Sequence, residues 1–117
     1  MKPGRLGVWY STDKLDGSQL RDFVRRVESN GYSNLWYPES RGYESMSLAS
    51  WLLSSSEKLV IGSSIANIYA RDSFTAQSAM VSLKRFTATG SFSVLASATF
   101  RWSRACVAIA TTNRWRR

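Results

Sequence analysis

The sequence predicts a single α/β domain built on a parallel sheet. Three short apolar, β-prone runs begin near residues 6, 35 and 59, and a stretch with helical periodicity follows each of them. Strands that alternate with helices in this way indicate parallel pairing, and the spacing suits βα units of roughly 30 residues. With 117 residues the chain is long enough to bury one core.

The first unit has a strand over Leu6–Tyr10 and a helix with clear boundaries. Asp16 precedes Gln19 by three residues, the spacing of a capping box that satisfies free amides at a helix start. Gly31 is placed to end the helix, because glycine accepts the left-handed conformation of a C-terminal cap. Apolar residues between these signals follow a helical stripe: Leu20, Phe23, Val24 and Val27.

The second unit begins with a strand over Leu35–Tyr37, which Pro38 ends because proline has no amide to donate. A polar loop follows, and then a short helix is predicted over Met46–Leu53. Its predicted inner side consists of Leu48, Ala49, Leu52 and Leu53.

The third unit begins with a strand over Leu59–Ile61, and Asp72 is a good N-cap for the helix that runs to about Phe86. The predicted inner face of this helix consists of Ala76, Ala79, Met80 and Leu83. Between strand and helix lies a loop, 63–72, rich in small and hydrogen-bonding residues. Such loops, at the C-terminal ends of parallel strands, are where α/β proteins bind ligands.

The periodic pattern ends after Phe86. Phe92–Leu95 is a candidate fourth strand, whereas residues 101–117 show no clean period. The charge is also uneven, because residues 1–86 carry 11 basic and 8 acidic side chains whereas residues 87–117 carry five arginines and no acid. We therefore divide the chain into a βα region, 1–86, and an irregular basic tail, 87–117.

The composition excludes several classes of protein. The chain contains no histidine, which removes Ser-His-Asp and Cys-His catalysis and the commonest zinc ligand. Cys106 is the single cysteine, so no intramolecular disulfide is available. No apolar run approaches the roughly 18 residues of a membrane span, and we expect a cytoplasmic location without a membrane partner.

Three stretches resemble the luciferase-like monooxygenase family, in particular its deazaflavin-dependent branch. They are residues 7–9, 31–39 and 65–72, which read GVW, GYSNLWYPE and IANIYARD. The resemblance covers roughly residues 5–86. It implies a TIM (β/α)8 barrel, of which this chain would supply about three to four βα units.

The resemblance also implies a function and a site. Members of the family use a reduced flavin or deazaflavin, here FMN or an 8-hydroxy-5-deazaflavin coenzyme, for hydride transfer or for oxygen insertion into a small-molecule substrate. The family's loop after the third strand, often bulged, packs on the cofactor ring. Carried over, this implies cofactor contacts from Glu39 and substrate contact from Trp9, with the remaining cofactor contacts from Ser64, Ile65, Ala66 and Asn67. No catalytic residue and no metal ligand is implied.

The tail departs from the family, which leads to the hypothesis that it is read out of frame. Residues 102–110 can be encoded by TGG TCG AGG GCG TGC GTG GCC ATC GCG. Without its first two bases this DNA reads Val-Glu-Gly-Val-Arg-Gly-His-Arg, and a Val-Glu-Gly-Val-Arg-Gly-His type segment is typical of the family. We expect a frameshift between about Met80 and Ser97, and an N-terminal barrel fragment that is inactive alone.

Simpler interpretations stay open for each site residue. The residues Ser64–Asn67 could form only a polar turn between strand and helix. Glu39 could be a solvated carboxylate in a loop, and Trp9 could pack at the barrel mouth without contacting a substrate. Arg71 and Asp72 favour helix capping with a local ion pair over catalysis. For the whole chain, one alternative is a small basic module that binds nucleic acid through the arginines and tryptophans of the tail. Another is a half-barrel that assembles with another chain, including a second copy.

Overall fold

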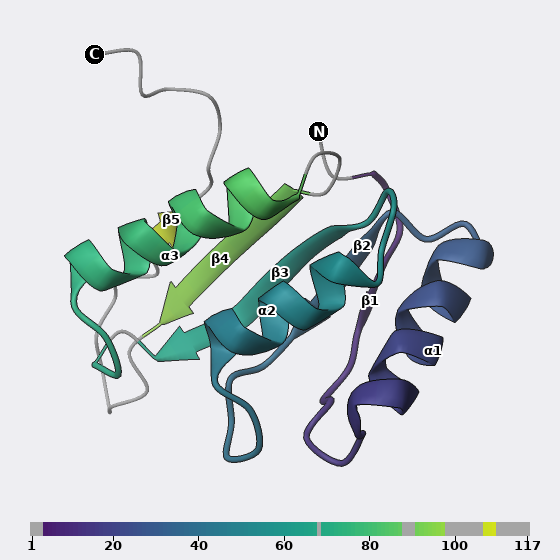
Figure 1. The fold of residues 1–117 in the computed structure, drawn as a ribbon, viewed down its shortest axis with the longest axis horizontal. Helices are drawn as coiled ribbons and strands as arrows, with labels where there is room; N and C mark the ends of the chain where they lie inside the picture. The colour runs from purple at the N-terminus through teal and green to yellow at the C-terminus, as the bar shows by residue number, and fades with distance from the viewer. Residues whose placement is uncertain (1–3, 68, 88–90, 98–106, 110–117) are drawn as a thin grey trace.

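The computed structural model describes residues 4–67, 69–87, 91–97 and 107–109, and its first six elements alternate between strand and helix (Figure 1). Two further strands follow among the described residues. In chain order the elements are β1 (Gly7–Trp9), α1 (Gly17–Ser29), β2 (Asn34–Tyr37), α2 (Ser45–Ser54), β3 (Val60–Asn67), α3 (Ser73–Phe86), β4 (Ser91–Ser97) and β5 (Val107–Ile109).

The strands form one sheet in the order β1-β2-β3-β4-β5. The pairs β1–β2, β2–β3 and β3–β4 are parallel, which confirms the prediction from alternating strands and helices. β4 contains the candidate fourth strand. β5 adds an antiparallel pair that the sequence did not predict, because the stretch 101–117 that contains it shows no clean period.

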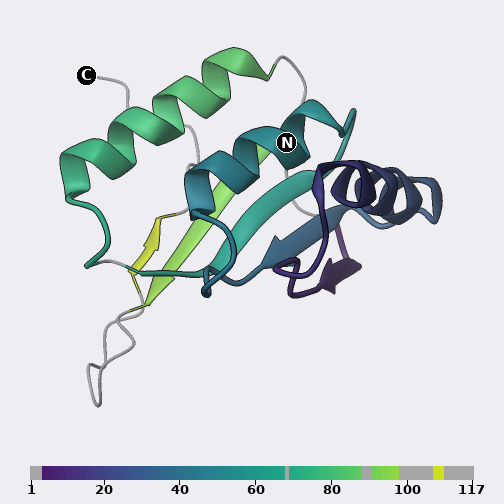
Figure 2. The same cartoon turned by 60° about the horizontal axis from the view of Figure 1, so that its bottom comes forward.

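The three helices cover the same face of the sheet (Figure 2). Val8, Leu35 and Ile61 lie side by side in register across β1, β2 and β3, and they pack into the core beneath the helices. Leu35 and Ile61 are fully buried. The core is therefore a single apolar layer between sheet and helices, as expected for βα units.

The predicted helix faces are confirmed for α1 and α2 and hold in part for α3. The stripe of α1 and the inner side of α2 belong to the core or pack against it. In α3 only Leu83 is buried, whereas Ala76, Ala79 and Met80 are half-buried. The reason is that α3 lies at the margin of the helical layer, with α2 on one side only among the described helices (Figure 1).

The predicted helix caps are confirmed. The Gln19 amide donates to the Asp16 carboxylate and the Asp16 amide donates to the Gln19 side chain, both at 2.9 Å. Gly31 follows α1 with a φ of +83°, a conformation that favours glycine. The side chain of Asp72 accepts from the Thr75 amide at the start of α3.

Within the described residues, no helix is long and apolar enough to cross a membrane. Cys106, the arginines of the tail and its two tryptophans, Trp102 and Trp115, lie outside the described residues. The nucleic-acid interpretation that rests on these arginines and tryptophans stays a prediction.

Candidate functional site

The candidate site lies at the edge of the sheet where the parallel strands end, which we call the C-terminal edge. β1 ends at Trp9 and β2 at Tyr37, while β3 continues from Ser63, the register partner of Tyr37, to Asn67. Because the three strands are parallel, the loops that follow them meet at this one edge (Figure 1). The sequence prediction that these loops share an edge is confirmed.

The end of β3 is irregular. The register with β4 shifts between Ser64 and Ala66, and the Ser64–Ile65 peptide bond is cis. The bulge that the family resemblance implied is therefore present. We call residues 64–67 the bulge segment. Within it, the side chain of Ile65 is exposed whereas Ala66 is buried in the core, so Ala66 can offer a ligand only its backbone.

The backbone of the bulge segment is held by the neighbouring strands and loops. The indole Nε1 of Trp9 donates to the Ser64 carbonyl at 3.2 Å. The Glu39 amide donates to the Ile65 carbonyl at 3.0 Å, and a Glu39 carboxylate oxygen accepts from the Asn67 amide at 2.7 Å. These contacts come from the end of β1 and from the loop after β2, and they fix the backbone of the segment within the chain itself.

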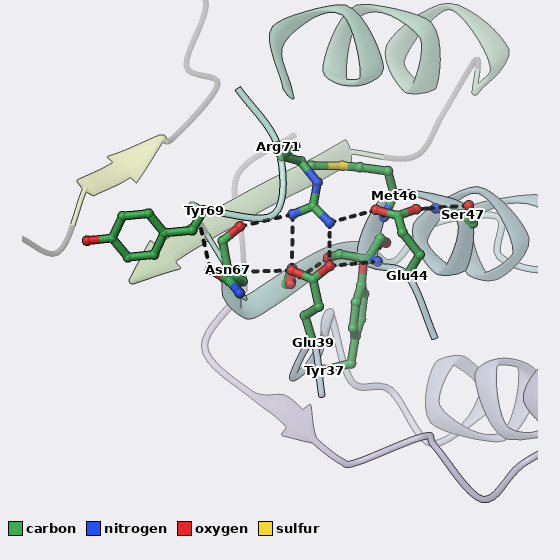
Figure 3. A network of polar contacts seen from close by, with 10 residues as sticks. Tyr37, Glu39, Glu44, Met46, Ser47, Asn67, Tyr69 and Arg71 are labelled. Atoms are coloured by element: carbon green, nitrogen blue, oxygen red, sulfur yellow. Dashed lines mark hydrogen bonds and ion pairs between the residues drawn. The ribbon is translucent and has the colours of Figure 1, made fainter. Parts of the chain in front are cut away.

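A partly buried ion-pair network joins the loop after β2 to the loop after β3 (Figure 3). The Arg71 guanidinium donates to both carboxylate oxygens of Glu39, with 3.0 Å between Nη1 and Oε2. Its Nη2 also donates to Glu44 at 2.7 Å. The side chains of Arg71 and Glu39 are each only 10% exposed, whereas that of Glu44 is 49% exposed.

The network keeps both carboxylates ionised. Burial by itself would raise the pKa of Glu39, but hydrogen bonds from Arg71 and from the Asn67 amide, together with the Arg71 charge, bring that pKa below its ordinary value. The pKa of Glu44 is lowered in the same way, mainly by the amides of Met46 and Ser47. Glu39 is therefore a hydrogen-bond acceptor at neutral pH and has no proton to give.

A second, fully buried group of hydrogen bonds lies directly behind the network. The Tyr37 hydroxyl donates to the Ser45 carbonyl at 2.7 Å, and the Ser45 and Ser63 hydroxyls are 2.8 Å apart. Burial raises the pKa of Tyr37 above its ordinary value, because the phenolate would be desolvated. Tyr37 therefore stays neutral and supports the site from within the core.

The loop after β1 is tied to the loop after β2. The Ser40 hydroxyl bonds to the Asp13 carboxylate, and the Tyr43 hydroxyl donates to the Leu15 carbonyl. Together with the Arg71 network, these contacts connect all three loops at the C-terminal edge. The described loops thus form one connected surface.

The predicted site residues are brought together by this arrangement. Trp9 donates to the Ser64 carbonyl at the start of the bulge segment, and Glu39 accepts from the Asn67 amide at its end. The side chain of Ile65 is exposed between these two contacts. Their assignment to cofactor and substrate stays a prediction. In the described ranges, no three His, Cys, Asp or Glu side chains gather where a metal ion could bind.

The expected local ion pair between Arg71 and Asp72 is wrong. The Asp72 carboxylate is occupied by the amide and hydroxyl of Thr75, and Arg71 instead reaches Glu39 and Glu44 across the loops. Sequence reasoning also missed Glu44. The available signal was the pair of acids in the loop after the second strand, with one arginine in the next loop.

The comparisons with known proteins agree with this architecture. The luciferase-like monooxygenase family profile matches residues 1–88, and the chain belongs to this family. The matched residues contain the parallel strands β1, β2 and β3 and the three helices, an arrangement that corresponds to part of a TIM barrel.

Among solved structures, the chain is similar to the coenzyme F420 dependent tetrahydromethanopterin reductase of Methanopyrus kandleri, with a TM-score of 0.62 and 19% sequence identity. The match covers 70% of this chain and 24% of that protein, so the chain spans about a quarter of its length. No curated protein sequence matches the chain.

Proposed function

We propose that this chain carries the cofactor-contacting part of an oxidoreductase that uses reduced FMN or an 8-hydroxy-5-deazaflavin coenzyme. One observation carries the proposal: the bulge segment at the C-terminal edge is fixed between Trp9 and Glu39 while it exposes Ile65. In TIM barrels, ligands bind at this edge of the sheet.

The residues present fit a flat, largely apolar ring with polar margins. Ile65 is 39% exposed and Trp9 58% exposed, so both offer apolar surface to a ligand. We assign cofactor contact to Ser64, Ile65, Ala66, Asn67 and Glu39, with the Ala66 contribution limited to its backbone. Trp9 would border the substrate. When bound, the reduced cofactor supplies the hydride or activates oxygen, and the protein supplies position and electrostatics.

We also propose that the 117-residue chain has no turnover by itself. A closed TIM barrel has eight parallel strands, whereas the described sheet has four parallel strands and one short antiparallel strand. The remaining wall of a substrate cavity would have to come from further βα units. A second chain is one source of such units, and concentration-dependent assembly into a compact oligomer would support that arrangement. The compartment we propose is the cytoplasm.

The test is an NMR titration of the chain with FMN and, separately, with the deazaflavin coenzyme. We expect the largest amide shift changes at residues 64–67 and 39, and a loss of binding in Ile65→Asp. Leu6→Asp is the matched control, because Leu6 is an exposed apolar residue that precedes β1 at the opposite edge. Shift changes confined to other parts of the chain, or equal effects of the two variants, would contradict the assignment.

The origin of the tail needs a separate test. We propose that residues 87–117 are read out of frame, and sequencing the locus should reveal βα-coding DNA in another frame. An intact frame with no such DNA downstream would rule this out. Salt-dependent retention of the chain on DNA, lost on truncation after Phe86, would instead favour the nucleic-acid alternative.

A further inference from the structure

We propose that Arg71 is a positioning residue for the cofactor. Its guanidinium orients the Glu39 carboxylate, and that carboxylate in turn accepts from the Asn67 amide. The bulge segment is thereby fixed in the conformation that contacts the cofactor, which we call the receiving conformation. The role in cofactor binding rests on the proposed function. The claim that Arg71 fixes the bulge segment through Glu39 is testable without any cofactor.

The hydrogen-bond geometry shows why an arginine is needed. Oε2 of Glu39 accepts from Arg71 Nη1 at 3.0 Å and from the Asn67 amide at 2.7 Å. Oε1 accepts from Arg71 Nη2 and, at 3.3 Å, from the Ser45 amide. A planar guanidinium that binds both oxygens sets the rotation of the carboxylate, and a lysine ammonium cannot do this.

The network also ties the loop to a regular element. Glu44, which accepts from Arg71, is the N-cap of α2 and accepts from the Met46 and Ser47 amides at 3.0 and 2.8 Å. Arg71 thereby connects the first turn of α2 with the end of β3 (Figure 3). The position of the bulge segment is therefore fixed by contacts to a helix, which is more rigid than a loop.

Arg71 also contacts the bulge segment directly, by a longer hydrogen bond than those to the carboxylates. Its Nη1 donates to the Asn67 carbonyl at 3.5 Å, and the Ala70 amide donates to the same carbonyl at 3.3 Å. Both partners of the Arg71–Glu39 pair are 10% exposed, so water competes weakly for these contacts. Without Arg71, the Glu39 carboxylate gains hydration by turning outward, and the Asn67 amide loses its partner.

The first experiment measures amide hydrogen exchange in the free chain. In Arg71→Met we expect the Asn67 amide to exchange about tenfold faster, with a smaller increase in Arg71→Lys. The core amides of Leu35 and Ile61 should keep their wild-type rates, which a general loss of stability would change. Arg25→Met is the matched control, because Arg25 lies exposed on α1.

An unchanged exchange rate at Asn67 in Arg71→Met would overturn the proposal. So would a parallel rise at Asn67, Leu35 and Ile61, because that result would give Arg71 a purely structural role.

The second experiment measures the Kd for FMN and for the deazaflavin coenzyme. If the receiving conformation falls to about a tenth of the population, the apparent Kd rises about tenfold. Combining Arg71→Met with Glu39→Gln should add little to either single change, because both act on one contact. A higher Kd in Arg71→Met with an unchanged exchange rate at Asn67 would mean that Arg71 itself contacts the cofactor. That result would overturn the proposed positioning role of Arg71.

The two experiments separate the two proposals. If the wild-type chain binds neither coenzyme, the proposed function fails, while the exchange rate of Asn67 still decides whether Arg71 fixes the bulge segment.

Discussion

The helix-covered core and the C-terminal edge are held together by different kinds of contact. The core joins apolar side chains that recur at helical or strand spacing within each element. The edge joins polar groups far apart in the chain: Trp9 with Ser64 over 55 positions, Glu39 with Arg71 over 32, and Glu44 with Arg71 over 27.

This difference indicates that the core tolerates substitutions of similar volume, whereas the edge requires particular polar groups in particular positions. Apolar packing is non-directional, so the core depends mainly on the volume and burial of its side chains. Hydrogen bonds and ion pairs are directional, so each group at the edge must be placed to within a fraction of an ångström. We therefore expect core substitutions to affect the whole domain and edge substitutions to affect local order.

The largest effect is expected in the core. Leu35→Ala should lower the free energy of unfolding by about 3 kcal/mol, because Leu35 is fully buried in the central part of the sheet and its removal leaves a cavity. Urea denaturation measures this change. Leu6→Ala, at a side chain that is 67% exposed, is the control and should stay within about 0.5 kcal/mol. Equal losses in the two variants would mean that the core is not packed as described.

The next largest loss of stability is expected at the buried Ser45–Ser63 hydroxyl pair, which lies between the core and the C-terminal edge. Ser63→Ala should cost about 1–2 kcal/mol, because it leaves the buried Ser45 hydroxyl without its partner. The double variant Ser45→Ala and Ser63→Ala should cost less than the sum of the single variants, since no unpaired hydroxyl remains. Strict additivity in urea denaturation would show that the two hydroxyls do not interact.

A smaller effect is expected from the charges at the edge. Glu39→Gln should cost about 1 kcal/mol at pH 7, limited by partial solvent screening. The folded-state pKa values of Glu39 and Glu44 lie below the ordinary 4.5. Their stabilisation is therefore complete above that pH and is lost as the pH falls through the lowered values.

The same variant should flatten this acid dependence. Urea midpoints measured from pH 7 to pH 3 should fall less steeply in Glu39→Gln than in the wild type. Glu57→Gln is the control, because Glu57 is exposed and its carboxylate takes no part in the network. An unchanged slope in Glu39→Gln would contradict an ionised, hydrogen-bonded Glu39.

The smallest change in stability is expected at Trp9. Trp9→Phe removes the indole donor to Ser64 but should stay within about 0.5–1 kcal/mol, because the ring is largely exposed. Its amide shift changes should centre on Ser64 and Ile65. Trp51→Phe is the matched control, since it removes a similar indole bond to the Gly17 carbonyl on the helical side. Identical shift patterns would contradict the Trp9–Ser64 contact.

Sequence reasoning recovered the parts of the fold that local patterns encode. The capping box at Asp16, the glycine at position 31 and the stripe of α1 all appear where predicted, because each depends on residues within about two turns. For α3, periodicity predicted the face correctly, but its burial depends on which neighbours cover it. β5 lies in a stretch of sequence without a clean period, and its pairing with β4 could not be predicted.

The site could be predicted only in outline. The bulge at Ser64 to Ala66 was implied by the family resemblance, and no local pattern in the chain encodes it. The partners of Arg71 were predicted wrongly, because Asp72 is its neighbour in sequence whereas Glu39 and Glu44 become neighbours only when β2 and β3 pair.

The sequence by itself determined the alternation of strands and helices, the apolar faces, and the edge at which the loops meet. These features follow from periodicity and from the fixed direction of parallel strands. Only the tertiary structure decided which polar groups bind one another across that edge, because long side chains reach several partners and sheet register selects among them. Arg71 illustrates this point: its charge is visible in the sequence, but its role depends on the carboxylates that the sheet places beside it.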